Sequence, residues 1–129
     1  MTINELMSKT NILNDKKCES ALMNEIKEQK NLHKFKYPGI YILTNENDEI
    51  VYIGSAYARN LRDRLMQYQQ KRNTGNNSLY LDLIDAGITS EDNAYDYILS
   101  LKINAYESYS EEYELIKIAN ISIINKMGK

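Results

Sequence analysis

Runs of apolar residues separated by polar breaks predict a mixture of short strands and helices in this chain. Residues 39–44 and 50–53 are β-branched and aromatic, and residues 45–48 between them read Asn-Glu-Asn-Asp. Two such runs around a short polar turn predict a β-hairpin. Residues 94–103 place large apolar side chains at alternate positions, and this pattern predicts a third strand.

Apolar residues at helical spacing predict helices on either side of these strands. The predicted helices cover residues 15–29, 60–72, 78–86 and 110–119. The first could be capped by Asn14 or Asp15 and would place Cys18, Leu22, Met23 and Ile26 on one stripe. We expect an irregular lead over residues 1–12 and a short extended segment over residues 121–124.

This order of elements predicts an α+β fold, with a small three-stranded antiparallel sheet flanked by helices. The chain has 129 residues, which is the size of a single domain, and no repeat or long linker divides it. We expect residues 1–36 to form an N-terminal helical extension and residues 37–129 to form the main domain.

Composition excludes several classes of site. One cysteine, Cys18, cannot form an internal disulfide, and together with one histidine, His33, it cannot build a Cys/His zinc cluster. No apolar run approaches the ~20 residues that span a bilayer, and the N-terminus has no signal-peptide pattern. We therefore expect no membrane association and a cytoplasmic location.

The net charge of −2 does not indicate a nucleic-acid binder, but its distribution is uneven. Residues 81–129 carry four lysines against nine acidic residues, a net charge of −5. A basic cluster lies before them, opposed locally by Asp63 alone, and comprises Arg59, Arg62, Arg64, Lys71 and Arg72. Such a cluster can be a solvated helix face, or a phosphate-binding face beside a cation site.

Two tripeptides in the predicted hairpin form a recognisable sequence motif. Gly39-Ile40-Tyr41 lies on the first predicted strand and, after ten intervening residues, Tyr52-Ile53-Gly54 lies on the second. This pattern resembles the signature of the GIY-YIG nuclease family. Leu61, Arg64 and Tyr68 match the Leu-x-x-Arg-x-x-x-Tyr spacing of that family's first helix, and Glu112 begins a Glu-x-x-Leu-Ile motif like the one that holds its metal ligand. The resemblance covers about residues 37–126.

The resemblance implies a metal-dependent endonuclease that hydrolyses phosphodiester bonds in DNA with Mg²⁺ (or Mn²⁺). It implies that Glu112 binds the metal, that Arg64 holds the scissile phosphate, and that Tyr41 acts on the attacking water as general base or as its positioner. Tyr52 and Tyr68 would orient the water or the phosphate. These residue types suit the reaction, because a phosphoryl transition state needs positive charge and an aligned water.

Several alternatives remain open at this level. Arg62 lies at the same offset from Gly54 as the catalytic arginine of many relatives, because the segment after Gly54 is about two residues longer than in many of them. Glu111 and Glu114 neighbour Glu112, and the family's closing asparagine has only a weak match in Asn125. The chain could also be a catalytically weak or inactive module that binds nucleic acid or a protein. Because the chain has almost no room for a separate DNA-targeting domain, we expect modest intrinsic sequence specificity, or targeting through a homodimer or a partner.

Overall fold

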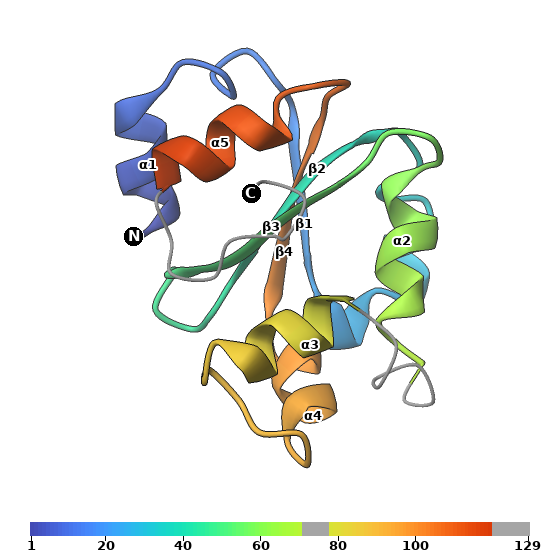
Figure 1. Cartoon of the computed structure of the whole chain (residues 1–129). Coiled ribbons are helices and arrows are strands. Elements are labelled where there is room, and N and C mark those ends of the chain that lie inside the picture. The colour runs from blue at the N-terminus through green and yellow to red at the C-terminus, as the bar shows by residue number, and fades with distance from the viewer. Residues whose placement is uncertain (71–77, 120–129) are drawn as a thin grey trace.

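The computed structural model describes residues 1–70 and 78–119, which form an α+β fold around a four-stranded antiparallel sheet (Figure 1). The strands are β1 (Cys18–Leu22), β2 (Gly39–Thr44), β3 (Ile50–Ala56) and β4 (Lys102–Glu107). The α-helices are α1 (Ile3–Lys9), α2 (Leu61–Gln67), α3 (Ser78–Asp85), α4 (Ala94–Leu99) and α5 (Glu112–Ala119). Two 3₁₀ turns, η1 (Met23–Glu25) and η2 (Gln29–Asn31), follow β1.

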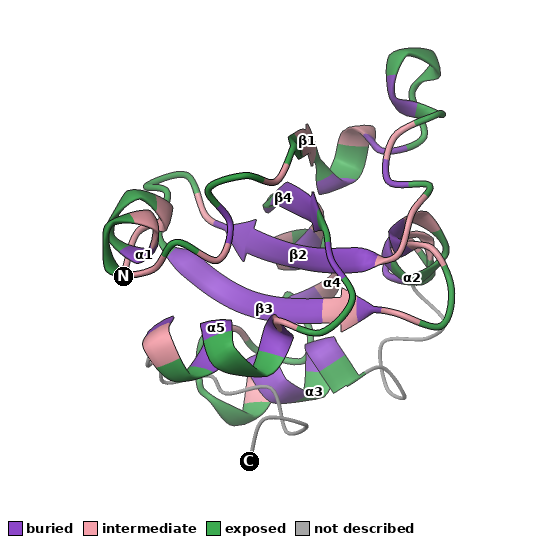
Figure 2. Cartoon of the chain, turned by 90° about the horizontal axis from the view of Figure 1, so that it is seen from above, coloured by how far each residue is buried: buried purple, intermediate pink, exposed green. Residues whose placement is uncertain are grey.

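The strand order is β1-β4-β2-β3, so β2 lies inside the sheet and β3 forms one of its edges. Every residue of β2 is buried, as Figure 2 shows along the strand. One face of the sheet packs against α2, α3 and α4, and the other packs against α1 and α5. Both faces are therefore covered, which explains why the hairpin strands read as continuous apolar runs.

The predicted hairpin and the three later helices are confirmed, since β2, β3, α2, α3 and α5 fall within or overlap the predicted ranges. The predicted third strand is wrong over 94–99, where α4 forms, and β4 begins at Lys102. Ala94 and Ile98 are both buried, one helical turn apart, whereas Tyr95 and Tyr97 are only half-buried. Burial of residues four positions apart is the helical pattern, and it outweighed the alternation of apolar residues that had predicted a strand.

The sheet has a fourth strand where the sequence predicts a helix over 15–29. Residues Cys18 to Leu22 pair with β4, and both end residues of this strand are exposed. An edge strand that is half-exposed carries little period-two pattern, so its hydrogen bonds to β4 decide its conformation. The irregular lead expected over 1–12 is also wrong, because α1 forms there behind a capping box of Thr2 and Glu5.

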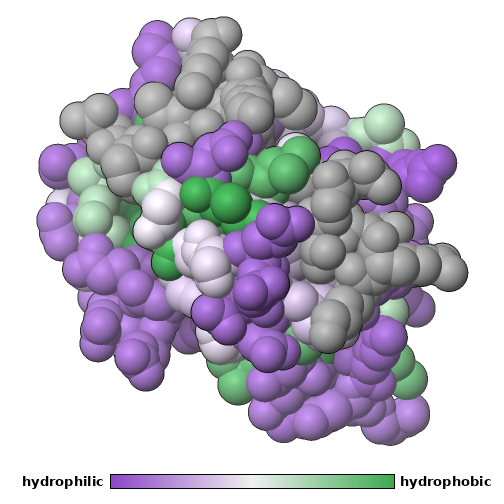
Figure 3. Space-filling view, turned by 60° about the horizontal axis from the view of Figure 1, so that its bottom comes forward, coloured by the Kyte–Doolittle hydropathy of each residue, from purple (hydrophilic) through white to green (hydrophobic). Residues whose placement is uncertain are grey.

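Hydrophilic side chains cover most of the described surface on the face seen in Figure 3, around a smaller hydrophobic patch. Within the described ranges, no helix is both long and apolar enough to cross a bilayer. The segment predicted as extended over 121–124 and the candidate residue Asn125 lie outside the described residues.

Candidate active site

Two strands bring the tyrosines of both tripeptides onto one face of the sheet. In the register of β2 and β3, Tyr41 lies opposite Gly54 and Leu43 lies opposite Tyr52. The rings of Tyr41 and Tyr52 are stacked, with centroids 6.3 Å apart and an interplanar angle of 24°. Strand parity thus places both phenols among the buried residues beneath α2 and α3.

Gly54 makes room for the phenol of Tyr41. A Cβ atom built on Gly54 would lie 2.3 Å from both Cζ and Oη of Tyr41. Gly39 has a similar constraint, since a Cβ there would lie 2.2 Å from the carbonyl oxygen of Tyr106 on β4. The two glycines are required by close approach of neighbouring groups within the sheet.

Replacing Gly54 with alanine is expected to destabilise the fold by about 2–3 kcal/mol, because the added methyl group overlaps the Tyr41 ring and must displace it. Chemical unfolding of both proteins measures this difference. Gly87→Ala is the matched control, since Gly87 has a φ of +75° but no atom within 4 Å of its built Cβ. That control should lose only about 1 kcal/mol through backbone strain. Equal losses in the two variants would contradict the steric explanation.

Helix α2 adds a third tyrosine to this pair. Asn60 caps α2 through a bond from the Asp63 amide, and Leu61 and Leu65 are buried beneath the helix. Tyr68, at the end of the same stripe, lies with its hydroxyl oxygen 2.5 Å from that of Tyr41. Either hydroxyl can be the donor, so the two phenols form one hydrogen-bonded pair.

Burial keeps these phenols neutral. It raises the pKa of Tyr41 well above the ordinary value of 10.0, and the Arg64 guanidinium opposes this only as a smaller effect. Burial also raises the pKa of Tyr68, while its hydrogen bond with Tyr41 and the nearby Arg64 lower it. Neutral hydroxyls can hold a water or an oxygen by hydrogen bonds, whereas a phenolate base would be costly at this position.

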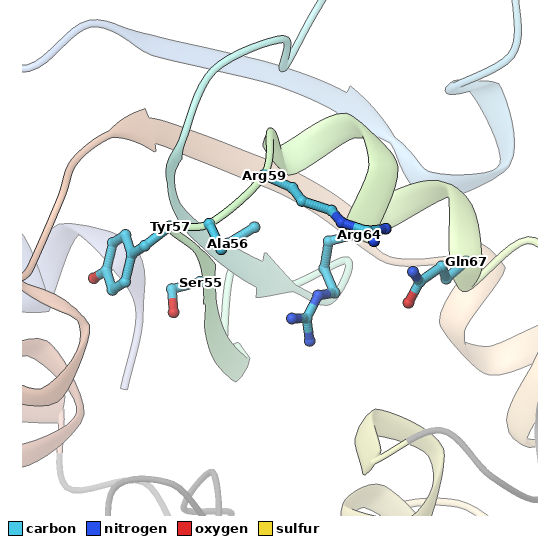
Figure 4. Close-up of a pocket in the computed structure, with 7 residues that line it drawn as sticks. Ser55, Ala56, Tyr57, Arg59, Arg64 and Gln67 are labelled. Carbon is cyan, nitrogen blue, oxygen red and sulfur yellow. The ribbon is translucent and has the colours of Figure 1, made fainter.

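An open pocket of about 390 Å³ lies beside this pair, at the edge strand β3. Its lining includes Ser55, Tyr57, Arg59, Arg64 and Gln67. Figure 4 shows Ser55 from β3 and Arg64 from α2 extending toward the same open side. Tyr41, Tyr52 and Tyr68 do not line the pocket, because they lie buried behind it with exposures of 2%, 2% and 1%. The guanidinium of Arg64 thus connects the open pocket with the buried phenol pair.

Glu112 reaches this edge from the opposite face of the sheet. It is the first residue of α5 and is only 5% exposed. Its Oε2 accepts a hydrogen bond from the Ser55 hydroxyl at 2.5 Å, and Ser55 belongs to the pocket lining. Burial raises the pKa of Tyr68, and the charge of Glu112 adds to that rise. The negative charge of Glu112 therefore lies close enough to the edge of β3 to influence Tyr68 on the other face of the sheet.

Comparison with known families identifies the protein family that has this arrangement of residues. The sequence profile of the GIY-YIG catalytic domain matches residues 37–119, which include the hairpin, α2 and Glu112. The chain belongs to the GIY-YIG family. The resemblance read from the two tripeptides is thereby confirmed, and the family is one of nucleases, whose substrates are nucleic acids. No curated protein and no solved structure gave a significant match to the chain.

The basic residues of this GIY-YIG domain have different surroundings. The guanidinium of Arg62 donates to the carbonyl oxygens of Asn31 at 2.8 Å and Ile26 at 2.9 Å, so it ties the segment before β2 to α2. Arg59 and Arg64 instead line the pocket. Lys71 and Arg72 lie outside the described residues. Of the two arginines that the sequence left as alternatives, Arg64 is the one that reaches the pocket.

Two residues of the site were not singled out from the sequence. Ser55 and Tyr57 both contact Glu112, Ser55 through its hydroxyl and Tyr57 through the Glu112 amide, which donates to the phenol oxygen at 2.9 Å. Their proximity to Gly54 in sequence was the only available signal. It did not reveal a partner 55 residues further along the chain.

A divalent cation fits this donor set, and relatives in the family typically depend on one. No group of three or more His, Cys, Asp or Glu side chains able to hold a metal occurs among residues 1–70 and 78–119. Mg²⁺ needs no such cage, because it retains several waters and binds through one or two carboxylates together with substrate phosphate. Glu112 supplies one fixed, nearly buried carboxylate of this kind.

Proposed function

We propose that this protein is a metal-dependent endonuclease that hydrolyses phosphodiester bonds in DNA. The observation that carries the proposal is the meeting of three groups at the edge of β3. These are the pocket-facing Arg64, the Tyr41–Tyr68 pair behind it and the Glu112 carboxylate held by Ser55. Together they offer positive charge, neutral hydrogen-bonding groups and a hard oxygen ligand.

Arg64 would bind two oxygens of the scissile phosphate with its planar fork of donors. Arg59 lies in the same pocket and would bind a neighbouring phosphate. Arg62 is not part of this proposal, because its donors are used by main-chain carbonyls. A phosphate entering the pocket would therefore meet two guanidinium groups without displacing an internal contact of Arg62.

Glu112 would hold Mg²⁺ (or Mn²⁺), which when bound supplies charge for the phosphate oxygens and activates water. The neutral hydroxyls of Tyr41 and Tyr68 lie behind the pocket and would orient Arg64 toward the phosphate. Raised pKa values support a positioning role for Tyr41 over a phenolate base. Tyr52 stacks on Tyr41 at 6.3 Å and would hold its ring in place.

Supercoiled plasmid DNA is the direct test of the proposed activity. The purified chain is expected to convert it to nicked or linear product in Mg²⁺ or Mn²⁺ and to leave it intact in excess chelator, since the hydrolysis depends on the cation. Gel electrophoresis over time measures the conversion, and the same gel shows any retarded DNA. Retardation without cleavage in either metal would favour the alternative, a binding module, and would overturn the nuclease assignment.

A further inference from the structure

One short stretch of chain holds Glu112 at two points. Ser55, the penultimate residue of β3, donates its hydroxyl to Oε2 of Glu112 at 2.5 Å. Tyr57, the first residue after the strand, accepts the main-chain N–H of Glu112 with its hydroxyl at 2.9 Å. The same stretch thus contacts the side chain and the backbone of one buried residue, which limits its movement in two directions.

Both contacts satisfy groups that burial would otherwise make costly. The first amides of an α-helix have no partner within the helix, and Tyr57 takes the place of such a partner at the start of α5. A buried carboxylate also requires hydrogen-bond donors, and Ser55 provides one.

Ser55 and Tyr57 also lie in the wall of the pocket where phosphate would bind. A hydroxyl that donates to one carboxylate oxygen selects a rotamer and an orientation of the whole group. Outer contacts of this kind on a metal ligand typically change metal affinity by about 10- to 100-fold when removed. Helix stability alone would not require the contact from Ser55, because Ser55 bonds the side chain and not the backbone of α5.

We propose that Ser55 and Tyr57 are positioning residues that set the affinity of Glu112 for its divalent cation. This inference rests on the proposed function, in which Glu112 is the metal ligand. Ser55 orients the carboxylate through Oε2, and Tyr57 fixes the backbone from which that side chain extends. Neither residue needs to touch the cation or the DNA for this role.

Binding of Mn²⁺ tests the proposal without any cleavage step. The electron paramagnetic resonance signal of free Mn²⁺ loses amplitude when the ion binds to protein. Titration of the full chain with Mn²⁺ therefore gives a dissociation constant for the ion. We expect Ser55→Ala and Tyr57→Phe each to raise that constant by about tenfold. Ser55→Thr keeps the hydroxyl on a strand and should restore most of the affinity. Ser100→Ala and Tyr113→Phe are the matched controls, since both residues are exposed and neither contacts Glu112 in the described hydrogen bonds.

The Mg²⁺ dependence of the DNA cleavage rate is a second measurement. The Mg²⁺ concentration for half-maximal rate should rise in Ser55→Ala and Tyr57→Phe, while the rate at saturating Mg²⁺ should recover toward that of the wild type. Thermal melting separates this from a structural role, because a helix contact alone would lower the melting temperature and leave the Mn²⁺ constant unchanged.

Three results would overturn the inference, and they differ in what they say about the nuclease. An unchanged Mn²⁺ constant in both variants, with wild type binding normally, removes the role of Ser55 and Tyr57 and leaves the proposed function intact. Failure of Ser55→Thr to restore affinity removes the role of the Ser55 hydroxyl. Wild type that neither binds Mn²⁺ nor cleaves DNA removes both proposals together.

Discussion

Glu112→Ala is expected to lower the rate of plasmid cleavage by at least about a thousandfold, because it removes the described carboxylate that can hold the cation at the pocket edge. In the proposed mechanism, loss of the metal would remove both the positive charge that stabilises the phosphate and the activation of water. Binding of DNA should change little, since Arg59 and Arg64 still line the pocket. Cleavage time courses and gel retardation with the same DNA measure the two effects.

Glu114→Ala is the matched control for this change. Glu114 lies on the same helix as Glu112 and carries the same charge, but it is exposed. Its loss should leave the cleavage rate within about twofold, because an exposed charge at this distance is screened by salt. A Glu112→Ala protein that folds and cleaves at the wild-type rate would refute the role of this carboxylate.

Arg64→Ala is expected to lose cleavage activity and keep its stability, whereas Arg62→Ala is expected to lose stability and keep its activity. Removing Arg64 should lower cleavage by about 100- to 1,000-fold, the usual cost of losing one preorganised donor to a developing charge. Its exposed side chain contributes little to packing, so the free energy of unfolding should hardly change. Cleavage rates and chemical unfolding curves on the same preparations give both quantities.

Arg62→Ala should instead lower the free energy of unfolding by on the order of 2–3 kcal/mol, because its guanidinium is half-buried and bonded to main-chain carbonyls. The cleavage rate per folded molecule should stay near that of the wild type at a temperature where the variant is folded. The reverse pattern, with Arg62→Ala inactive and Arg64→Ala merely unstable, would exchange the roles of the two arginines.

Local patterns in the sequence were sufficient for the hairpin and for α2, α3 and α5, but not for α4, which was predicted as a strand. The alternation of side chains along a strand placed Tyr41 and Tyr52 on one face only if they shared parity across the hairpin, and the pairing of Leu43 with Tyr52 supplies that parity. Helical spacing placed Tyr68 on the apolar stripe of the helix predicted over 60–72, and the structure shows Arg64 on the exposed side of α2. These features depend on neighbours a few residues apart, so they can be read before the fold is known.

The N-terminal third shows where such patterns fail. The stretch over 15–29 has apolar residues at helical spacing, yet residues Cys18 to Leu22 form a strand because β4 offers an edge to pair with. The residues of β4 that pair with this strand are 80 to 88 positions further along the chain, so the local sequence does not indicate the pairing. Similarly, the carbonyl oxygens of Ile26 and Asn31 accept hydrogen bonds from Arg62 only when the segment before β2 lies against α2.

The sequence alone determined the family, the hairpin, and the residue types that a metal-dependent phosphodiesterase needs, because these are carried by short motifs of fixed spacing. Only the tertiary structure decided between Arg62 and Arg64 at the pocket, joined Glu112 to Ser55 and Tyr57, and buried the tyrosine hydroxyls. The physical reason is that hydrogen-bond partners, burial and pKa depend on groups that are distant in the chain. Those groups become neighbours only when the sheet has formed and its two faces are covered.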